Sequence, residues 1–242
     1  MKSYIIIPAR MESERLPNKP LLEMNGKPLL QWTHERALQV GADNVLVTTP
    51  DQEIINFCNK NNMECYESSY DNPTGTHRCA EIIFRLEIEQ ENDIQNENER
   101  TVIVNWQCDE PLIEPDDVFK LMNAVDLFFD IGTLVAPLWP GLMEDRNITK
   151  AIVGKNAIAH WFTRTPTNYA KGHIGIYAFR QPTLKKLKKL RVTELSKQES
   201  LEQLTWIENG FTIGSIGTKE MPLSINCPED IELFNELHNA SL

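Results

Sequence analysis

Residues 4–21 of the chain read Tyr4-Ile5-Ile6-Ile7-Pro8-Ala9-Arg10-Met11-Glu12-Ser13-Glu14-Arg15-Leu16-Pro17-Asn18-Lys19-Pro20-Leu21. An apolar run typical of a buried strand ends in a loop that carries the cations Arg10, Arg15 and Lys19, and a helix is expected to open near Pro28. In an open α/β sheet, ligands bind outside the carboxyl ends of the strands, so these cations lie where a polyanion would be held. The stretch therefore predicts a nucleotide-triphosphate site.

The composition sets the class of protein. The chain has 242 residues, of which 41% are hydrophobic, enough for the core of one large α/β domain, with or without a small subdomain. A net charge of -11 argues against a nucleic-acid partner, which would need a basic surface. Since no apolar run approaches the roughly 20 residues that span a bilayer, and the apolar start is too short for a signal peptide, we expect a cytoplasmic enzyme without a membrane partner.

The cysteines give no sign of a disulfide framework or a zinc site. They are odd in number, scattered, and include no CxxC pair, so we expect reduced thiols. The residues concerned are Cys58, Cys65, Cys79, Cys108 and Cys227.

The first half of the chain predicts a Rossmann-like, mostly parallel sheet with crossover helices, because strand-like runs alternate with segments of helical period. The expected central strands are Ile5–Pro8, Asn44–Thr49 and Thr101–Trp106, and the expected helices are Pro28–Gly41, Gln52–Asn61 and Thr76–Gln90. The polar segment Asn92–Arg100 lacks apolar periodicity and is expected to be a solvated loop.

After Ile131 the pattern changes to that of a small, partly antiparallel second lobe. Strands follow one another at Ile131–Leu138, Ile148–Gly154, Ala157–Arg164 and His173–Phe179. The chain is expected to close with helices at Thr183–Leu190 and Glu199–Gly210, a strand at Thr212–Ile216 and a helix after Pro228. We expect a single domain over residues 1–242 with three parts: a nucleotide-binding part at 1–130, the second lobe at 131–225, and a C-terminal helix at 226–242 that returns to the core.

An acidic pair, Asp109 and Glu110, follows the strand Thr101–Trp106 at the same sheet edge as the Arg10 loop. A carboxylate there can hold Mg²⁺, which neutralises triphosphate charge and orients the α-phosphorus for attack. The alternative is an Asp-Glu-Pro turn that caps the next helix. The segment alone favours neither interpretation.

Three further segments are each open to two interpretations. The turn Asn72–Arg78 leads into a helix whose free amides suit an anion or a base edge, although a plain Thr N-cap is commoner. His173 opens an apolar strand and Arg164 ends another, but a lone strand histidine is more often structural than catalytic. Glu202 and Gln203 project about 100° apart from one helix, where a solvated face is the usual explanation.

Taken in this order, the segments resemble the 3-deoxy-manno-octulosonate (Kdo) cytidylyltransferases, the CMP-Kdo synthetases of lipopolysaccharide and capsule pathways. The resemblance covers nearly the whole chain and keeps one collinear order. It is carried by Pro8-Ala9-Arg10, Arg15-Leu16-Pro17, Lys19-Pro20-Leu21, Asn25-Gly26-Lys27-Pro28, Gly75-Thr76 with Arg78, Gln107 with Asp109-Glu110-Pro111, Phe162 with Arg164, His173-Ile174-Gly175-Ile176-Tyr177, Glu199-Ser200-Leu201-Glu202-Gln203-Leu204, and Pro228-Glu229-Asp230.

The resemblance implies a nucleotide-diphospho-sugar transferase-like fold and a homodimer built through the second lobe. It implies Mg²⁺-dependent transfer of CMP from CTP to the anomeric hydroxyl of Kdo or a related 2-keto-3-deoxy sugar acid, with release of pyrophosphate. The implied catalytic residues are Arg10, Lys19 and Asp109, and the implied nucleotide-binding residues are Arg10, Arg15, Lys19, Thr76, Arg78 and Gln107. The implied sugar-binding residues are Arg164, His173, Glu202 and Gln203, and the implied metal ligands are Asp109 and Asn226.

The chain departs from the family close to these residues. Asn226 stands where the family has a second metal-binding Asp, and its amide brings no negative charge. Cys108 replaces a Gly where backbone approaches the nucleotide, and Glu14 replaces a Ser or Thr beside the triphosphate loop. Asn18 replaces a Gly, a milder change because Asn tolerates the left-handed conformation. The departures on the acceptor side are His77, Gly172 and the short segment 165–172.

Three hypotheses follow from the matches and the departures. Residues retained on both the nucleotide and the sugar side favour an active CTP-dependent cytidylyltransferase. Asn226, Cys108 and Glu14 motivate a weakly active or inactive nucleotide- or sugar-binding paralogue. Cys108, His77 and the short loop motivate a nucleotidyltransferase with a different base or acceptor.

Overall fold

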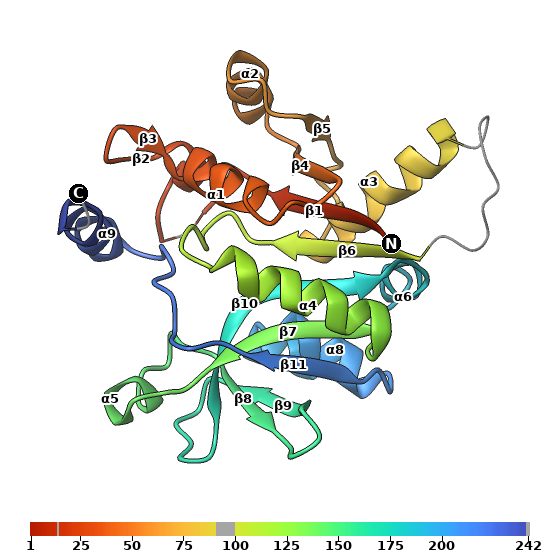
Figure 1. Cartoon of the computed structure of the whole chain (residues 1–242), viewed down its shortest axis with the longest axis vertical. Coiled ribbons are helices and arrows are strands. Elements are labelled where there is room, and N and C mark those ends of the chain that lie inside the picture. The colour runs from red at the N-terminus through yellow and green to blue at the C-terminus, as the bar shows by residue number, and fades with distance from the viewer. Residues whose placement is uncertain (14, 91–99, 241–242) are drawn as a thin grey trace. The chain divides into compact units, whose positions relative to one another are not determined.

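The computed structural model describes residues 1–13, 15–90 and 100–240. Glu14, and the predicted loop Asn92–Arg100 except for Arg100, lie outside the described residues. The chain divides into two compact units (Figure 1). Unit 1 comprises Met1–Lys2, Glu99–Val104 and Asp116–Met221, and unit 2 comprises Ser3–Asn98, Asn105–Pro115 and Pro222–Leu242.

The sheet of unit 2 is parallel, as the apolar runs predict. Its strands lie in the order β5 (Cys65–Glu67), β4 (Asn44–Thr49) and β1 (Lys2–Pro8). Ile5, Ile6 and Ile7 are all fully buried, which is typical of a parallel strand covered on both faces. The predicted strands at the start of the chain are therefore confirmed, while the three-residue β5 is too short to show a periodicity.

Helices cover both faces of this sheet. They are α1 (Leu29–Leu38), α2 (Gln52–Lys60) and α3 (Gly75–Gln90), while α9 (Pro228–Ala240) contacts β2 and packs on Trp32 of α1. Each lies within three residues of the predicted bounds. Figure 1 shows α1 and α3 on opposite faces of β1. The start of α3 approaches the end of β1 closely, because a Cβ on Gly75 would lie 3.1 Å from Pro8.

Two short elements follow the cation loop of unit 2. The 3₁₀ helix η1 spans Lys19–Leu21, and strands β2 (Glu23–Met24) and β3 (Lys27–Pro28) form a hairpin. Asn25 and Gly26 turn this hairpin with φ of 45° and 78°, the positive pair that a type I′ turn requires. These elements were not predicted, since two-residue strands leave no periodic pattern.

Unit 1 contains the partly antiparallel lobe that the sequence predicts. Its sheet has the order β6 (Thr101–Trp106), β10 (Lys171–Arg180), β7 (Ile131–Ala136), β11 (Ile213–Gly217), β9 (Ile158–Thr163) and β8 (Lys150–Val153), with Thr101–Val104 of β6 in this unit. Strand β10 pairs antiparallel with β7 and β8, and β9 pairs antiparallel with β8 and β11. Strands β7 and β11 are parallel.

The helices of unit 1 are α4 (Pro115–Leu127), α5 (Pro140–Met143), α6 (Gln181–Leu187), α7 (Glu194–Glu199) and α8 (Glu202–Glu208). The register of the sheet decides which helix covers which face. Gly132 of β7 faces α4, because a Cβ there would lie 2.7 Å from Leu121 and Val125. Tyr177, one position from the register partner of Gly132, faces the other way and packs on Trp206 of α8.

The predicted helix Glu199–Gly210 corresponds to α8, which begins three residues later than predicted, and the short helix α7 before it was not predicted. Helix α7 ends at Glu199, Ser200 takes the left-handed conformation with φ 53°, and α8 begins at Glu202. The Ser196 hydroxyl donates to the Leu201 carbonyl at 2.9 Å, and the Leu201 N–H donates to the Ser196 carbonyl at 3.1 Å. The Ser196 side chain thus satisfies the Leu201 carbonyl, and this local hydrogen bond stabilises the break between α7 and α8. In the described part of the chain, no helix is both long and apolar enough to cross a bilayer.

Candidate active site

The cation loop after β1 is fixed to the end of β4. The Ala9 N–H donates to the Thr48 carbonyl at 2.9 Å, and the Met11 N–H donates to Asp51 Oδ2 at 2.7 Å. Asp51 precedes α2 but makes no side-chain cap there, since its carboxylate holds the loop instead. At the other end Asn18 has φ 58°, which confirms that this residue takes the left-handed conformation.

Two of the three predicted cations contact the two predicted metal ligands. Lys19 Nζ donates to Asp109 Oδ2 at 2.6 Å, and only 13% and 23% of these side chains are exposed. Arg15 Nη2 donates to Asn226 Oδ1 at 3.0 Å. Arg10 is half exposed and pairs with Glu12 at 3.5 Å. The loop thus presents a cluster of cations directly beside a carboxylate and an amide.

The segment before α9 brings Asn226 to Asp109, far away in the sequence. The Ile225 N–H donates to the Asp109 carbonyl at 2.9 Å, and the Ser224 hydroxyl donates to Glu110 Oε1 at 2.7 Å. Asp230 Oδ2 then accepts the N–H of Asn226 at 2.7 Å, which fixes the backbone at the start of α9. Asp109 and Asn226 are therefore neighbours, and the Asp-Glu pair does not cap α4.

The donor chemistry of this pair fits Mg²⁺. Among the described residues, no group of three or more His, Cys, Asp or Glu side chains is placed to hold a metal ion. Mg²⁺, however, commonly binds through one or two carboxylates together with substrate phosphates. Asp109 supplies one carboxylate and Asn226 supplies a neutral oxygen. The two therefore suit a metal that arrives with a triphosphate, at a site carrying one protein charge fewer than two Asp residues would give.

Thr74 is the N-cap of α3, as one of the two interpretations of this turn expected. The Thr74 hydroxyl accepts the His77 N–H at 3.3 Å and lies 2.8 Å from His77 Nδ1. Behind this cap, Thr76 and Arg78 are buried, and Arg78 donates to the Asn72 carbonyl at 3.4 Å. His77 thus takes part in the cap.

The other predicted nucleotide contact lies at the end of β6. Gln107 is exposed, and its carbonyl accepts the Glu110 N–H at 3.1 Å in a tight turn. Cys108 in this turn is buried, and the Thr33 hydroxyl donates to its carbonyl at 2.6 Å. Burial raises the pKa of the Cys108 thiol. The side chain that replaces glycine is therefore a neutral thiol packed inside the unit.

The predicted sugar-binding residues all lie in unit 1, where His173 is buried. Its Nε2 lies 3.0 Å from the Thr133 hydroxyl, which itself donates to the Ile176 carbonyl at 2.7 Å. Nε2 is therefore the donor to Thr133, and Nδ1 is left as an acceptor. Burial, followed by the charge of Arg164, lowers the pKa of His173 to about 3. The imidazole is neutral near pH 7.

Arg164 lies close enough to His173, and Glu202 close enough to Tyr177, to act on them electrostatically. Arg164, just after β9, donates to the Asn147 carbonyl at 3.1 Å. Glu202 and Gln203 open α8, with Gln203 buried. Burial, and secondarily the Glu202 carboxylate, raise the pKa of Tyr177, whose ring lies 5.3 Å from that of His173.

Comparison with known proteins identifies the family. Residues 4–138 match the family described as Cytidylyltransferase. The chain is 34% identical to the 3-deoxy-manno-octulosonate cytidylyltransferase of Parabacteroides distasonis, over 96% of both chains. It is also 34% identical to the enzyme of that name from Chlorobium phaeobacteroides, over 100% of this chain and 99% of the relative. The chain belongs to the cytidylyltransferase family.

Solved structures agree with this assignment. A CMP:2-keto-3-deoxy-manno-octonic acid synthetase complexed with CTP superposes on the whole chain with a TM-score of 0.88 at 29% identity. A cytidylyltransferase from Leptospira borgpetersenii gives a TM-score of 0.62 at 19% identity, which shows the fold alone. The predicted family and the predicted α/β fold are both confirmed.

Sequence reasoning assigned no role to three polar residues that lie close to the predicted site residues of this cytidylyltransferase. Asp51 fixes the cation loop, Asp230 fixes Asn226, and Lys150 is a fully buried cation near Arg164. Asp51 precedes a helix, so its sequence signal is that of an ordinary N-cap. The signal at Lys150 is a charge inside an apolar strand, which could have been noticed.

Proposed function

We propose that this cytidylyltransferase transfers CMP from CTP to the anomeric hydroxyl of Kdo or a related 2-keto-3-deoxy sugar acid and releases pyrophosphate. One observation carries the proposal: Lys19 and Arg15 meet Asp109 and Asn226 in one cluster at the end of β1. Cations beside oxygen ligands are what a metal-bound triphosphate requires. The names of its relatives supply the acceptor, since two relatives that are 34% identical to this chain are named 3-deoxy-manno-octulosonate cytidylyltransferase.

The reaction we propose is a displacement at the α-phosphorus. The sugar hydroxyl oxygen forms the new bond to phosphorus, the bond to the bridging oxygen breaks, pyrophosphate leaves, and the hydroxyl proton passes to solvent. Such a displacement depends on positioning and electrostatics more than on covalent catalysis. Arg10, Arg15 and Lys19 would hold the triphosphate and stabilise the charge that develops on the departing pyrophosphate.

Asp109 and Asn226 are proposed to hold Mg²⁺. When bound, the metal supplies neutralisation of phosphate charge and activation of the sugar hydroxyl. The Lys19 ammonium now lies on Asp109, and a triphosphate gives this cation an alternative partner of higher charge. The nucleotide would therefore help to release the carboxylate for the metal.

The base and the sugar are assigned to the remaining predicted residues. Gln107, exposed after β6, is proposed to contact the cytidine, with Thr76 and Arg78 supporting the same region from the start of α3. These assignments follow the family resemblance.

On the sugar side, Arg164 would receive the substrate carboxylate through its planar donor fork. His173, Glu202 and Gln203 would line the pocket. Because His173 is neutral, it can offer the acceptor Nδ1 to a sugar hydroxyl but adds no charge.

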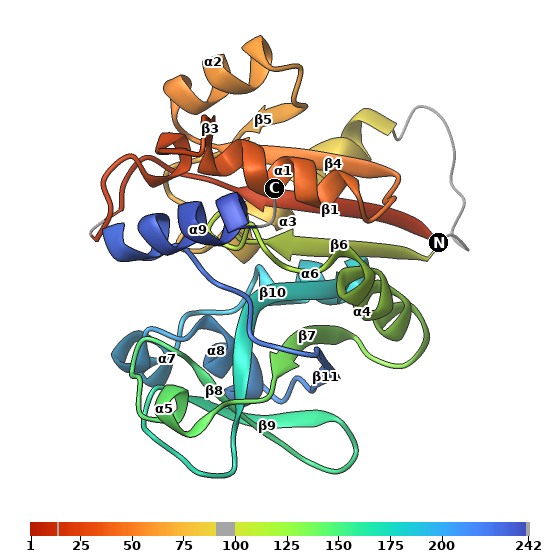
Figure 2. The same ribbon diagram turned by 60° about the vertical axis from the view of Figure 1, so that its left-hand side comes forward.

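The protein as a whole is proposed to be a cytoplasmic homodimer joined through residues 131–225, with residues 1–130 binding the nucleotide. Large exposed aromatic side chains of unit 1 support a second-lobe interface, since aromatic residues are enriched at protein–protein interfaces. They include Trp139 and Tyr169, which are 73% and 93% exposed. The predicted C-terminal helix is proposed to belong to the nucleotide part, and the contacts of α9 with β2 and with Trp32 of α1 support this; Figure 2 shows α9 next to α1.

A weakly active or inactive binding paralogue is the alternative that one observation favours. Asn226 is uncharged and already bonded to Arg15, so it offers a metal less than an aspartate would. The third hypothesis is a nucleotidyltransferase with a different base or acceptor. Cys108 supports it less, because the Cys108 side chain is buried.

Pyrophosphate release tests the proposal. The protein is incubated with Mg²⁺, each nucleoside triphosphate in turn, and a panel of 2-keto-3-deoxy sugar acids. Release with CTP and Kdo or a close relative is expected. No release with any pair, together with measurable CTP binding, supports the binding paralogue instead. Release with another nucleotide alone supports the altered-base hypothesis.

A further inference from the structure

Lys150 is a fully buried lysine in unit 1. It opens β8, where its register partners are Thr163 of β9 and Gly172 of β10. Removing an ammonium group from water costs several kcal/mol unless other groups compensate the charge. Lysine is accordingly among the residues that are rarely fully buried. The burial of this ammonium group therefore indicates that Lys150 has a specific role.

The partner of this lysine is a backbone group. Lys150 Nζ donates to the carbonyl of Asp145, and in the described part of the chain no carboxylate oxygen forms an ion pair with it. Burial lowers the pKa of Lys150, while the nearby carboxylates of Asp145 and Glu144 act in the opposite direction. The Lys150 ammonium therefore donates its hydrogen bond to the backbone of a turn.

That same turn holds Arg164. Arg164 Nη1 donates to the Asn147 carbonyl at 3.1 Å and to the Arg146 carbonyl at 3.5 Å. Within the turn, the Asn147 N–H donates to Asp145 Oδ1 at 2.8 Å, a typical Asx turn. Three consecutive carbonyls, those of residues 145–147, thus receive the two cations. Lys150 holds one end of the turn and Arg164 is held by the other.

We propose that Lys150 is a positioning residue for Arg164, acting through the turn at residues 145–147. It fixes the carbonyls on which the guanidinium rests, and so orients the group that receives the carboxylate of the acidic acceptor. A bidentate contact between guanidinium and carboxylate depends on orientation, so a loosened turn weakens acceptor binding. The inference rests on the proposed function, because it assigns a task in the proposed sugar site.

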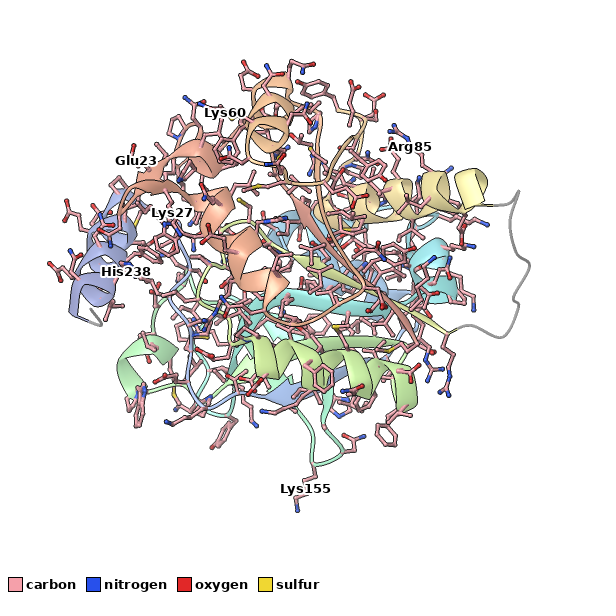
Figure 3. The ribbon with its side chains drawn as sticks, turned by 45° about the horizontal axis from the view of Figure 1, so that its top comes forward. Glu23, Lys27, Lys60, Arg85, Lys155 and His238 are labelled. Atoms are coloured by element: carbon pink, nitrogen blue, oxygen red, sulfur yellow. The ribbon has the colours of Figure 1, made fainter. Side chains whose placement is uncertain are left out.

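The test removes the charge of Lys150 and keeps a side chain of similar length. Lys150→Met preserves the length of the side chain, and Lys155→Met, at the exposed tip of the same β8–β9 hairpin (Figure 3), is the matched control. We expect Lys150→Met to raise the KM for the sugar acid about tenfold and to change the KM for CTP and kcat less than twofold. Lys155→Met leaves all three unchanged.

Two further variants separate positioning from general stability. Asp145→Ala removes the Asx contact from the turn while Lys150 remains, and it should raise the KM for the sugar acid in the same direction. Arg164→Ala combined with Lys150→Met should be no worse than Arg164→Ala alone, since both act through one group.

The inference is overturned if Lys150→Met leaves the KM for the sugar acid unchanged or raises both KM values equally. It is also overturned if the effects of Lys150→Met and Arg164→Ala add in the double variant. Should Lys150→Met fail to fold by circular dichroism, Asp145→Ala decides, and an unchanged sugar-acid KM there overturns it. A wild-type protein that turns over no sugar acid overturns the proposed function and this inference together. An active wild type with an unaffected Lys150→Met overturns the inference alone.

Discussion

At the scale of the residue, the site is built from contacts between segments distant in the sequence. Strand-end position and the family resemblance indicated Lys19, Asp109 and Asn226, but not that Lys19 bonds Asp109 or Arg15 bonds Asn226. Asn226 is brought to this site by the hydrogen bond between Ile225 and Asp109, which no local pattern encodes. Residue type was therefore predictable, whereas partnership required the folded chain.

The amide at position 226 gives the first prediction. Asn226→Asp adds a charge beside Asp109, so the Mg²⁺ concentration for half-maximal rate should fall about tenfold, equivalent to ~1.4 kcal/mol of metal binding. The measurement is a Mg²⁺ titration of pyrophosphate release with CTP and Kdo. Asn59→Asp adds the same charge on the exposed face of α2 and should leave the titration unchanged. An unaltered Mg²⁺ requirement in Asn226→Asp would refute the role of this position as a metal ligand.

The buried His173 gives a prediction about stability and pH. Its pKa falls from 6.5 to about 3 on folding, so between these values the unfolded chain binds a proton that the folded chain does not. The stability that His173 contributes is present above pH 6.5 and is lost as the pH falls toward 3. The slope from this group approaches about 1.4 kcal/mol per pH unit inside that window.

Urea unfolding of the wild type and of His173→Gln at intervals from pH 7 to pH 4 measures this slope. The stability advantage of the wild type should shrink as the pH falls, because glutamine does not titrate. His160→Gln, at an exposed position of β9, should keep the wild-type slope. Parallel pH curves for the wild type and His173→Gln would contradict the buried, neutral histidine.

At the scale of the element, periodicity located the long strands and the helices α1, α2, α3 and α9, but it predicted no helix at α4 or α7 and placed the start of α8 three residues early. β4 and β6 have the predicted bounds, since buried runs bounded by polar residues are unambiguous. The Glu199–Gly210 prediction begins three residues early, because Ser200 takes the left-handed conformation and the Ser196 hydroxyl satisfies the Leu201 carbonyl before α8 starts. Such a local hydrogen bond is invisible to a hydrophobic pattern.

Helix α9 shows how one element positions a site residue. Its aromatic side chains pack on Trp32, with ring centroids 5.4 Å away for Phe234 and 4.8 Å away for His238. Lys27 lies over the same Trp32 ring at 4.6 Å, and Figure 3 labels Lys27 and His238, which both contact this ring. The helix is thereby attached to α1 and β3, and its first turn carries Asp230, the residue that holds Asn226.

Removing the Asp230 carboxylate should weaken both the helix and the proposed metal site. Asp230→Ala leaves the N–H groups of Asn226 and Cys227 without their acceptor, at a cost of about 1 kcal/mol in unfolding free energy. The Mg²⁺ requirement should rise as well, because Asn226 loses its fixed backbone. Chemical denaturation and the Mg²⁺ titration measure the two effects. Glu232→Ala, exposed on the same helix, is the control, and an equal effect there would contradict the argument.

At the scale of the whole molecule, the proposed substrates divide between the two units. Every residue assigned to the nucleotide and metal belongs to unit 2, and every residue assigned to the sugar belongs to unit 1. The sequence indicated this division through its change of pattern after Ile131. It could not indicate that Asp116–Leu127 of α4 belongs to unit 1, since an amphipathic helix does not encode which sheet it covers.

This division predicts that cation substitutions act on one substrate at a time. Arg15→Ala should raise the KM for CTP by ten- to a hundredfold and leave that for the sugar acid within about threefold, because a charge-assisted contact contributes about 1.5–3 kcal/mol. Arg164→Ala should show the reverse. Steady-state kinetics with each substrate varied in turn gives both values. Arg85→Ala, exposed on α3 (Figure 3), and Arg191→Ala, exposed in unit 1, are the controls for lost positive charge. If either site variant raised both KM values equally, the assignment of that arginine to a single substrate would be wrong, since loss of a shared structural element is the remaining explanation for a uniform effect.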